Sequence, residues 1–250
     1  ADETPQEESK AVLDAGYQCA MGMLLWASRR VYSSCRVGVS ILCRVMSRPS
    51  WAAFYEAMGM IQWMYENRQR GLKFSKGVNW FPLGMVDASN LPDRKDAKCQ
   101  FGYVIMLAGA PIVELSKKLV HRGLGSGHNE YMALHFANQG LVWLRNLLTE
   151  IGLEELIQGP TVMLEDNKAA ITWATEDLVS MGNQYIYLPY HYNKEVQEEG
   201  LSAVMYVPSQ KNISDLHTKC VGAKEFRALH PAITGYDTRL VQELFKTAYK

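Results

Sequence analysis

Residues 81–89, FPLGMVDAS, carry the pattern that decides the fold. A mostly apolar run that ends in a carboxylate is typical of a buried strand whose last residues reach the surface. We therefore predict a strand from Phe81 to Asp87 that opens a domain beginning at residue 78.

The residues that follow indicate two more strands and then an alternation of helices and strands. The expected elements are strands at 102–108 and 111–115, a long helix at 130–151, a strand at 161–164, helices at 168–175 and 191–199, and a strand at 203–207. Three strands in series followed by alternation favour a mixed sheet with flanking helices, and so an α/β fold.

Residues 10–77 predict a small all-helical domain in front of the sheet. Apolar residues recur at helical spacing from Val12 to Met46, which fits two helices, and Pro49 ends this run. Ser50 is a suitable N-cap for a third helix, which we expect to stop at Gly71.

The two ends of the chain differ from the domains between them. Residues 1–9, ADETPQEES, are acidic and show no periodicity, so we predict a disordered lead-in. The sheet domain is expected to occupy residues 78–222, and residues 223–250 are interpreted as a C-terminal helical extension.

The 26 basic and 26 acidic residues give a formal net charge of zero, but they are unevenly distributed. Residues 10–77 hold ten bases and three acids, whereas residues 78–222 hold eleven bases and sixteen acids. This pattern fits a phosphate-following surface beside a site that gathers carboxylates, and it also fits ordinary variation between solvated faces. Five cysteines without a CxxC pair argue against a zinc site or a disulfide framework. This cysteine usage favours a reducing, intracellular compartment. The longest apolar stretch near the start is too short for a membrane span, so no signal peptide or anchor is expected.

Four acidic residues stand where this layout would bring them together. Asp87 ends the first strand, Glu130 opens the long helix, Asp166 follows the fourth strand and Asp215 opens a later helix. Gathered carboxylates repel one another unless hard divalent cations such as Mg²⁺ or Mn²⁺ neutralise them, and two such ions can catalyse phosphodiester hydrolysis. Each acid taken alone also suits a helix start or a turn.

The sequences around these acids resemble the reverse transcriptase and ribonuclease H parts of copia-type retrotransposon Pol polyproteins. The similar runs are YQCAMGMLLWASRR (17–30) for YRSxVGSLLYLA, GLKFSKG (71–77) for GLxFSKG, MVDASN (85–90) for TDADW, GSGHNEYMAL (125–134) for SSTEAEYMAL, LEDNKAAI (164–171) for CDNxSAI, YIYLPYHYNKEVQEEG (185–200) for HIDIRYHFIRExVxxG, and YVPSQKNISDLHTK (206–219) for YVPTxxQxADIFTK. The resemblance implies a ribonuclease H-like fold at 78–222, preceded by a connection-like or thumb-like helical region of reverse transcriptase at 10–77.

By the same resemblance, Asp87, Glu130, Asp166 and Asp215 correspond to the family's four metal-binding carboxylates. The implied activity is a two-metal-ion ribonuclease H, an endoribonuclease that uses Mg²⁺ or Mn²⁺ to cut the RNA strand of RNA–DNA hybrids during reverse transcription. The chain has no tyrosine-x-Asp-Asp polymerase signature, so the polymerase part of the same polyprotein is the expected partner. The implied location is the cytoplasm, a virus-like particle or the nucleus.

A ribonuclease H must recognise the 2′-hydroxyl of RNA and the shape of the hybrid, which requires hydrogen-bonding groups beside the metals. The candidates are Ser126, Asn129 and Asn167 near the acids, His191 in the family-like helix, and Arg68 and Arg70 for phosphates.

Some positions depart from the family pattern, and they bear on substrate contacts more than on metal binding. Ser89 stands at a usual aspartate, Val113 and Glu114 replace a serine and a tryptophan, and Phe101 replaces a small serine. One alternative is therefore an inactive ribonuclease H-like module that binds nucleic acid or is structural. A third reading, an integrase core, fits less well because its last acid is typically a glutamate, whereas this chain has Asp215.

Overall fold

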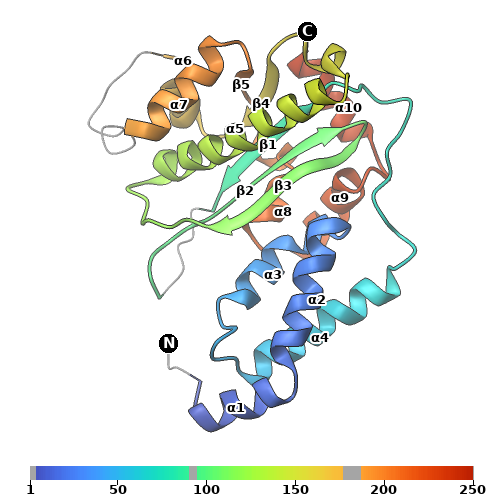
Figure 1. The fold of residues 1–250 in the computed structure, drawn as a ribbon, viewed down its shortest axis with the longest axis vertical. Coiled ribbons are helices and arrows are strands. Elements are labelled where there is room, and N and C mark those ends of the chain that lie inside the picture. The colour runs from blue at the N-terminus through green and yellow to red at the C-terminus, as the bar shows by residue number, and fades with distance from the viewer. Residues whose placement is uncertain (1–3, 90–94, 177–186, 250) are drawn as a thin grey trace.

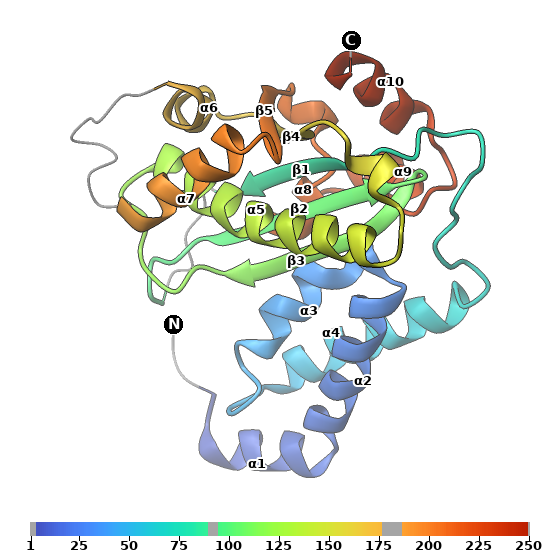
Figure 2. The ribbon, with the colours of Figure 1, turned by 45° about the horizontal axis from the view of Figure 1, so that its top comes forward.

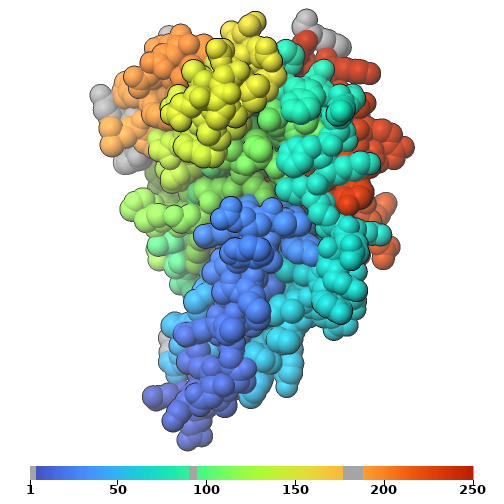
Figure 3. Space-filling view, turned by 45° about the vertical axis from the view of Figure 1, so that its right-hand side comes forward, coloured from blue at the N-terminus to red at the C-terminus, as the bar shows by residue number. Residues whose placement is uncertain are grey.

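The computed structural model describes residues 4–89, 95–176 and 187–249. Asn90, Tyr185 and Ile186, which belong to the family-like runs, lie outside these residues. A helical lobe formed by the first part of the chain projects from a larger body built on one sheet (Figures 1 and 3). Within the described ranges, no helix combines the length and apolarity that crossing a membrane requires.

The helical lobe consists of α1 (Gln6–Asp14), α2 (Tyr17–Arg30), the 3₁₀ turn η1 (Ser33–Cys35), α3 (Arg36–Cys43) and α4 (Trp51–Glu66). Its buried side chains are Val12, Tyr17, Met21, Leu24, Val39, Ala57 and Met64. The cap predicted at Ser50 is confirmed, because the Ser50 side chain accepts a hydrogen bond from the Ala53 amide.

Three expectations for this region are wrong. The stretch expected to form two helices contains three, α1, α2 and α3, because Gly16 with φ of 95° separates the first two. Residues 6–9 are not part of a disordered lead-in but form the first turns of α1, where Val12 is fully buried and anchors the helix in the lobe. The third helix ends at Glu66 rather than at Gly71, because Asn67 closes its last turn through a side-chain bond to the Trp63 carbonyl.

The sheet has five strands in the order β3-β2-β1-β4-β5. Their bounds are β1 (Leu83–Ala88), β2 (Gln100–Leu107), β3 (Ala110–Lys118), β4 (Thr161–Glu165) and β5 (Ser202–Tyr206). β1, β2 and β3 pair antiparallel, whereas β4 runs parallel to both β1 and β5. The predicted mixed sheet with flanking helices is confirmed.

One face of the sheet packs on α5 (Ser126–Glu150), which Figure 2 shows lying across the strands. Helices α6 (Lys168–Thr175) and α7 (Tyr187–Glu198) flank α5 on the same side. The predicted start of the long helix at Glu130 is wrong, because the Asn129 amide already bonds to the Gly125 carbonyl. Glu130 therefore lies one turn inside the helix.

The other face of the sheet is covered by the short helix α8 (Asp215–Thr218) together with α9 (Ala223–Ile233) and α10 (Arg239–Ala248). The side chains buried there from the two last helices are Leu229, Ala232, Ile233, Val241, Leu244 and Phe245. They pack against strand residues such as Met85 and Val104. Residues 223–249 are thus one wall of the core and not an appendage, because the sheet would otherwise leave an apolar face in water.

Candidate active site

Three of the four predicted carboxylates lie together at one end of the sheet. Asp87 is the penultimate residue of β1, Asp166 follows β4, and Glu130 comes from α5. Because β1 and β4 are adjacent and parallel, their carboxyl ends meet. One oxygen from each of the three carboxylates lies within 4.8 Å of the others.

These carboxylates line a cavity of about 440 Å³ that is open to solvent. Its lining residues are Asp87, Ala88, Ser89, Glu130, Asp166, Asn167, Ser209 and Lys219. The lining residues are polar except for Ala88, and three of them are acidic, which suits a cation and a polar substrate better than an apolar ligand.

The carboxylates are crowded and poorly hydrated. Burial, followed by the neighbouring charge of Asp215, raises the pKa of Asp87 to about 7. Burial and the charge of Glu165 raise the pKa of Glu130 well above its ordinary value. Glu165 is itself completely buried beside the cluster, and burial raises its pKa as well. The group therefore holds protons or needs a compensating positive charge near neutral pH.

The fourth carboxylate, Asp215, opens α8 as predicted, but it lies outside the group of three. Its Oδ1 pairs with Lys219 Nζ at 2.8 Å. Burial raises the pKa of Asp215, while the contact with Lys219 lowers it. Two residues of this helix region also reach the cluster, because Lys219 lines the cavity and the Thr218 hydroxyl donates a hydrogen bond to Asp87 Oδ2.

The residues present fit a hard divalent cation. Three carboxylates from different elements converge on one point, and Glu130 Oε2 is buried with no hydrogen-bond partner in the described part of the chain. Oxygen ligands of this kind are what Mg²⁺ and Mn²⁺ prefer. A cation held there would give the orphaned oxygen a partner and relieve the repulsion.

Of the three other predicted site residues near the acids, one lines the cavity and two do not. Asn167 lines the cavity, and its Oδ1 also caps α6 by accepting from the Ala169 and Ala170 amides. Ser126 is exposed at the start of α5 but does not line the cavity. Asn129 is buried, donates to Cys99 Sγ and does not line the cavity.

The remaining candidates lie away from this cavity. His191 is exposed on α7, with its ring against Tyr190. Arg68 follows α4 and stacks over the ring of Tyr65 at 4.3 Å, and Arg70 is exposed two residues later. None of these three lines the acidic cavity, so any contact with nucleic acid would be made elsewhere along a long substrate.

Sequence reasoning missed several residues that shape the site. Glu165, Thr218, Lys219 and Ser209 were not singled out, although all lie in the family-like runs. Lys219 could have been found from its spacing, since it stands four residues after Asp215 in a helical stretch. The contact between Thr218 and Asp87 joins positions 131 residues apart and has no local signal.

A carboxylate cluster at one end of a mixed five-stranded sheet is what the family-like runs predict, and the chain is similar in sequence to retrotransposon Pol polyproteins. Over 223 residues, or 89% of this chain, it is 23% identical to the retrovirus-related Pol polyprotein from transposon TNT 1-94 of Nicotiana tabacum. It is also 24% identical over 76% of its length to the Pol polyprotein from transposon RE2 of Arabidopsis thaliana. The resemblance to retrotransposon Pol polyproteins is thus confirmed. The chain spans only 16% and 13% of the length of these two relatives.

No protein-family model matches the chain. Among solved structures, it is similar to LC11-RNase H1 isolated from compost, with a TM-score of 0.43 and 15% identity over 56% of this chain and 93% of that one. It is also similar to RNase H1 from Halobacterium salinarum, with a TM-score of 0.40 and 15% identity over 55% of this chain and 93% of that one.

Proposed function

We propose that this chain is the ribonuclease H part of a retrotransposon Pol polyprotein and cuts the RNA strand of RNA–DNA hybrids with divalent cations. The observation that carries the proposal is the convergence of Asp87, Glu130 and Asp166 within 4.8 Å in an open polar cavity. The polymerase part of the same polyprotein is the partner we propose, since the relatives are several times longer than this chain. The place of action would be the cytoplasm, a virus-like particle or the nucleus.

In this proposal Asp87, Glu130 and Asp166 hold Mg²⁺ or Mn²⁺, and Asp215 completes the set from α8. Bound cations would supply Lewis-acid activation of water and neutralise charge on the phosphodiester. The pairing with Lys219 keeps Asp215 beside the cavity, and the Thr218 hydroxyl holds one oxygen of Asp87 in place.

Polar groups at the rim of the cavity would orient the RNA strand. Ser89, Asn167 and Ser209 line it and carry hydrogen-bonding groups suited to a 2′-hydroxyl or a phosphate oxygen. Ser89 stands where the family has an aspartate, so this rim is less acidic than the resemblance implies, which favours approach of an anionic strand.

The test is cleavage of an end-labelled RNA–DNA hybrid in Mg²⁺ or Mn²⁺, with double-stranded RNA and double-stranded DNA as controls. Asp166→Asn should lower hybrid cleavage by at least about 100-fold, because it removes one charged ligand of the cations. The matched control is Asp237→Asn, which neutralises an aspartate paired with Arg239 outside the site.

Cleavage of the hybrid by the Asp166→Asn variant at the wild-type rate would contradict the proposal. Binding of the hybrid by the folded wild-type protein without cleavage in either metal would instead favour an inactive nucleic-acid-binding module.

A further inference from the structure

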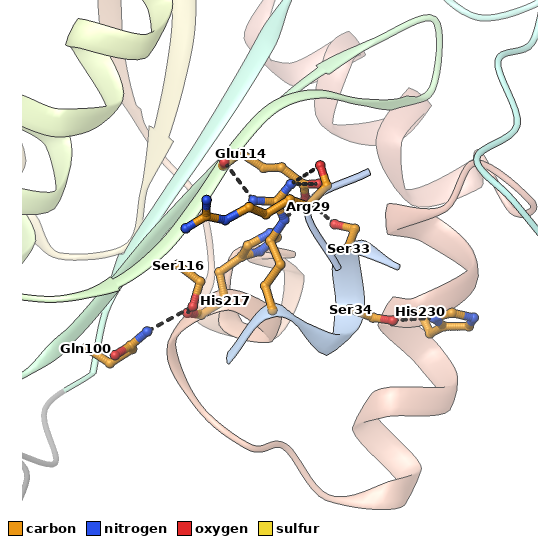
Figure 4. A network of polar contacts seen from close by, with 9 residues as sticks. Arg29, Ser33, Ser34, Gln100, Glu114, Ser116, His217 and His230 are labelled. Atoms are coloured by element: carbon orange, nitrogen blue, oxygen red, sulfur yellow. Dashed lines mark hydrogen bonds and ion pairs between the residues drawn. The ribbon is translucent and has the colours of Figure 1, made fainter. Parts of the chain in front are cut away.

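A buried polar cluster joins the helical lobe to the sheet at the side where α8 packs. It is built from Ser33 of η1, Arg36 of α3, Glu114 of β3 and His217 of α8. Figure 4 shows Ser33, Glu114 and His217 converging from three elements that are far apart in the sequence. We call these four residues the junction cluster.

Glu114 is the centre of the junction cluster. Arg36 contacts it twice, through a 2.6 Å ion pair to Oε1 and a 3.1 Å hydrogen bond to the backbone carbonyl. His217 Nε2 lies 3.0 Å from Oε2, and the Ser33 hydroxyl donates to the same oxygen. Burial would raise the pKa of Glu114, but the contacts from His217, Arg36 and Ser33 together lower it below its ordinary value. The Glu114 carboxylate is therefore charged, and both of its oxygens have polar partners.

A second series of contacts runs parallel to the first and ends on the same helix. Arg44 NH2 donates to Gln100 Oε1 at 2.6 Å, and Gln100 Nε2 donates to Ser116 Oγ at 2.9 Å. Ser116 Oγ in turn donates to the backbone carbonyl of His217 at 2.5 Å. The side chain and the backbone of His217 are thus each tied to the strands and to the helical lobe.

Helix α8 depends on such external ties. It has only four residues, and a single helical turn of this length is not stable by itself. The strand β2 lets it approach closely, because a Cβ at Gly102 would lie 2.3 Å from His217 Cβ. The neighbour of His217 in this turn is Thr218, whose hydroxyl holds Asp87, and the turn begins with Asp215.

We infer that Glu114 is a positioning residue for the carboxylate site: through His217 it holds α8, and with it Asp215 and the Thr218–Asp87 contact, in the geometry that receives the cations. The inference rests on the proposed function, since it concerns the same site. Glu114 does not line the cavity, and the family resemblance places a tryptophan at this position. The contact between Glu114 and His217 therefore arises at a position where this chain differs from the family pattern.

The experiment measures Mn²⁺ binding to the full chain by isothermal titration calorimetry, independently of cleavage. Glu114→Gln keeps the shape of the side chain but removes the charge that Arg36 and His217 share. We expect it to weaken Mn²⁺ binding about 10-fold, as loss of an outer contact to a metal site typically does. The KM for the hybrid at saturating metal should stay within about 2-fold of wild type. Glu243→Gln is the matched control, because it removes an exposed carboxylate paired with Lys211.

Ser116→Ala is a milder second variant, in case Glu114→Gln does not fold. It removes only the hydroxyl that holds the His217 carbonyl, and it should weaken Mn²⁺ binding in the same direction, by about 3-fold. If folded Glu114→Gln or Ser116→Ala protein is less stable but binds Mn²⁺ as wild type does, the contacts are merely structural and the inference is overturned.

The outcomes separate this inference from the proposed function. Wild-type protein that cleaves the hybrid, with variants of unchanged Mn²⁺ affinity, would overturn only the role of Glu114. Wild-type protein that binds Mn²⁺ more tightly than the variants, yet cleaves no hybrid, would support the positioning role and overturn the nuclease. Wild-type protein that binds no Mn²⁺ would overturn both.

Discussion

Neutralising a single carboxylate of the site should make the metal-free protein more stable while abolishing the proposed nuclease activity, and Asp87→Asn is the sharpest case. Asp87 is 4% exposed, and burial together with the charge of Asp215 raises its pKa to about 7. An asparagine has nearly the same shape, and its amide oxygen can still accept the hydrogen bond from Thr218. The substitution therefore removes the charge and leaves the packing.

The pKa gives the magnitude and the pH range. A folded pKa of about 7 against the ordinary 3.8 corresponds to at most about 4 kcal/mol of unfolding free energy. Because the folded pKa is raised, the contribution to stability is fully present below about pH 4 and is lost as the pH rises to about 7. Asp87→Asn does not suffer this loss, so its advantage should be small at pH 4 and reach its full value above pH 7.

The assay is denaturant unfolding of wild type and Asp87→Asn in EDTA, at pH 4, 6 and 8. At pH 8 the unfolding free energy of the variant should exceed that of wild type by about 1–4 kcal/mol. For a chain of this size, each kcal/mol should raise the melting temperature by roughly 2–4 °C. Added Mn²⁺ should stabilise wild type more than the variant, because the variant has lost one charged ligand. A variant that is equally or less stable than wild type at pH 8 in EDTA would refute the reasoning that the carboxylates are crowded.

Two packing predictions follow from the same structure. Gly102→Ala should destabilise the protein by about 1–3 kcal/mol in urea unfolding, because the new Cβ would meet His217, and it should also weaken Mn²⁺ binding. The control is Gly22→Ala, which has open space around it in α2 and should not destabilise the protein. Phe245→Ala should cost about 3–5 kcal/mol, since this side chain is 1% exposed in the core beneath the sheet. A loss below about 1 kcal/mol would mean that α10 is a loosely attached extension after all.

Local patterns predicted the elements well where the signal lies in neighbouring residues. The helix predicted at 168–175 is confirmed at its observed bounds as α6, Lys168–Thr175. Alternation and apolar runs placed the strands to within three residues at each end. The carboxylates were found because strand ends are where such side chains converge, and family-like runs surround them.

The misses have a common physical cause, which is that tertiary contacts decided the outcome. Residues 6–9 are acidic and polar, yet they are helical because the following Val12 is buried in the lobe. The last two helices looked like an extension because nothing in their sequence tells which face of a sheet they cover. The contact between Glu114 and His217 joins positions 103 residues apart, so no window along the chain could reveal it.

The contacts of the junction cluster oppose the electrostatic repulsion within the carboxylate site. Asp87 shares its strand face with Leu83 and Met85, toward α8, and there the charge of Asp215 acts on it directly. That repulsion pushes a four-residue helix away from β1, and the helix has too few bonds of its own to resist. The 3.0 Å contact between His217 Nε2 and Glu114 Oε2, together with the Ser116 hydrogen bond to the backbone of the helix, holds the same helix against the sheet. Like charges that lie this close without a cation need such a restraint, and here the helical lobe supplies part of it.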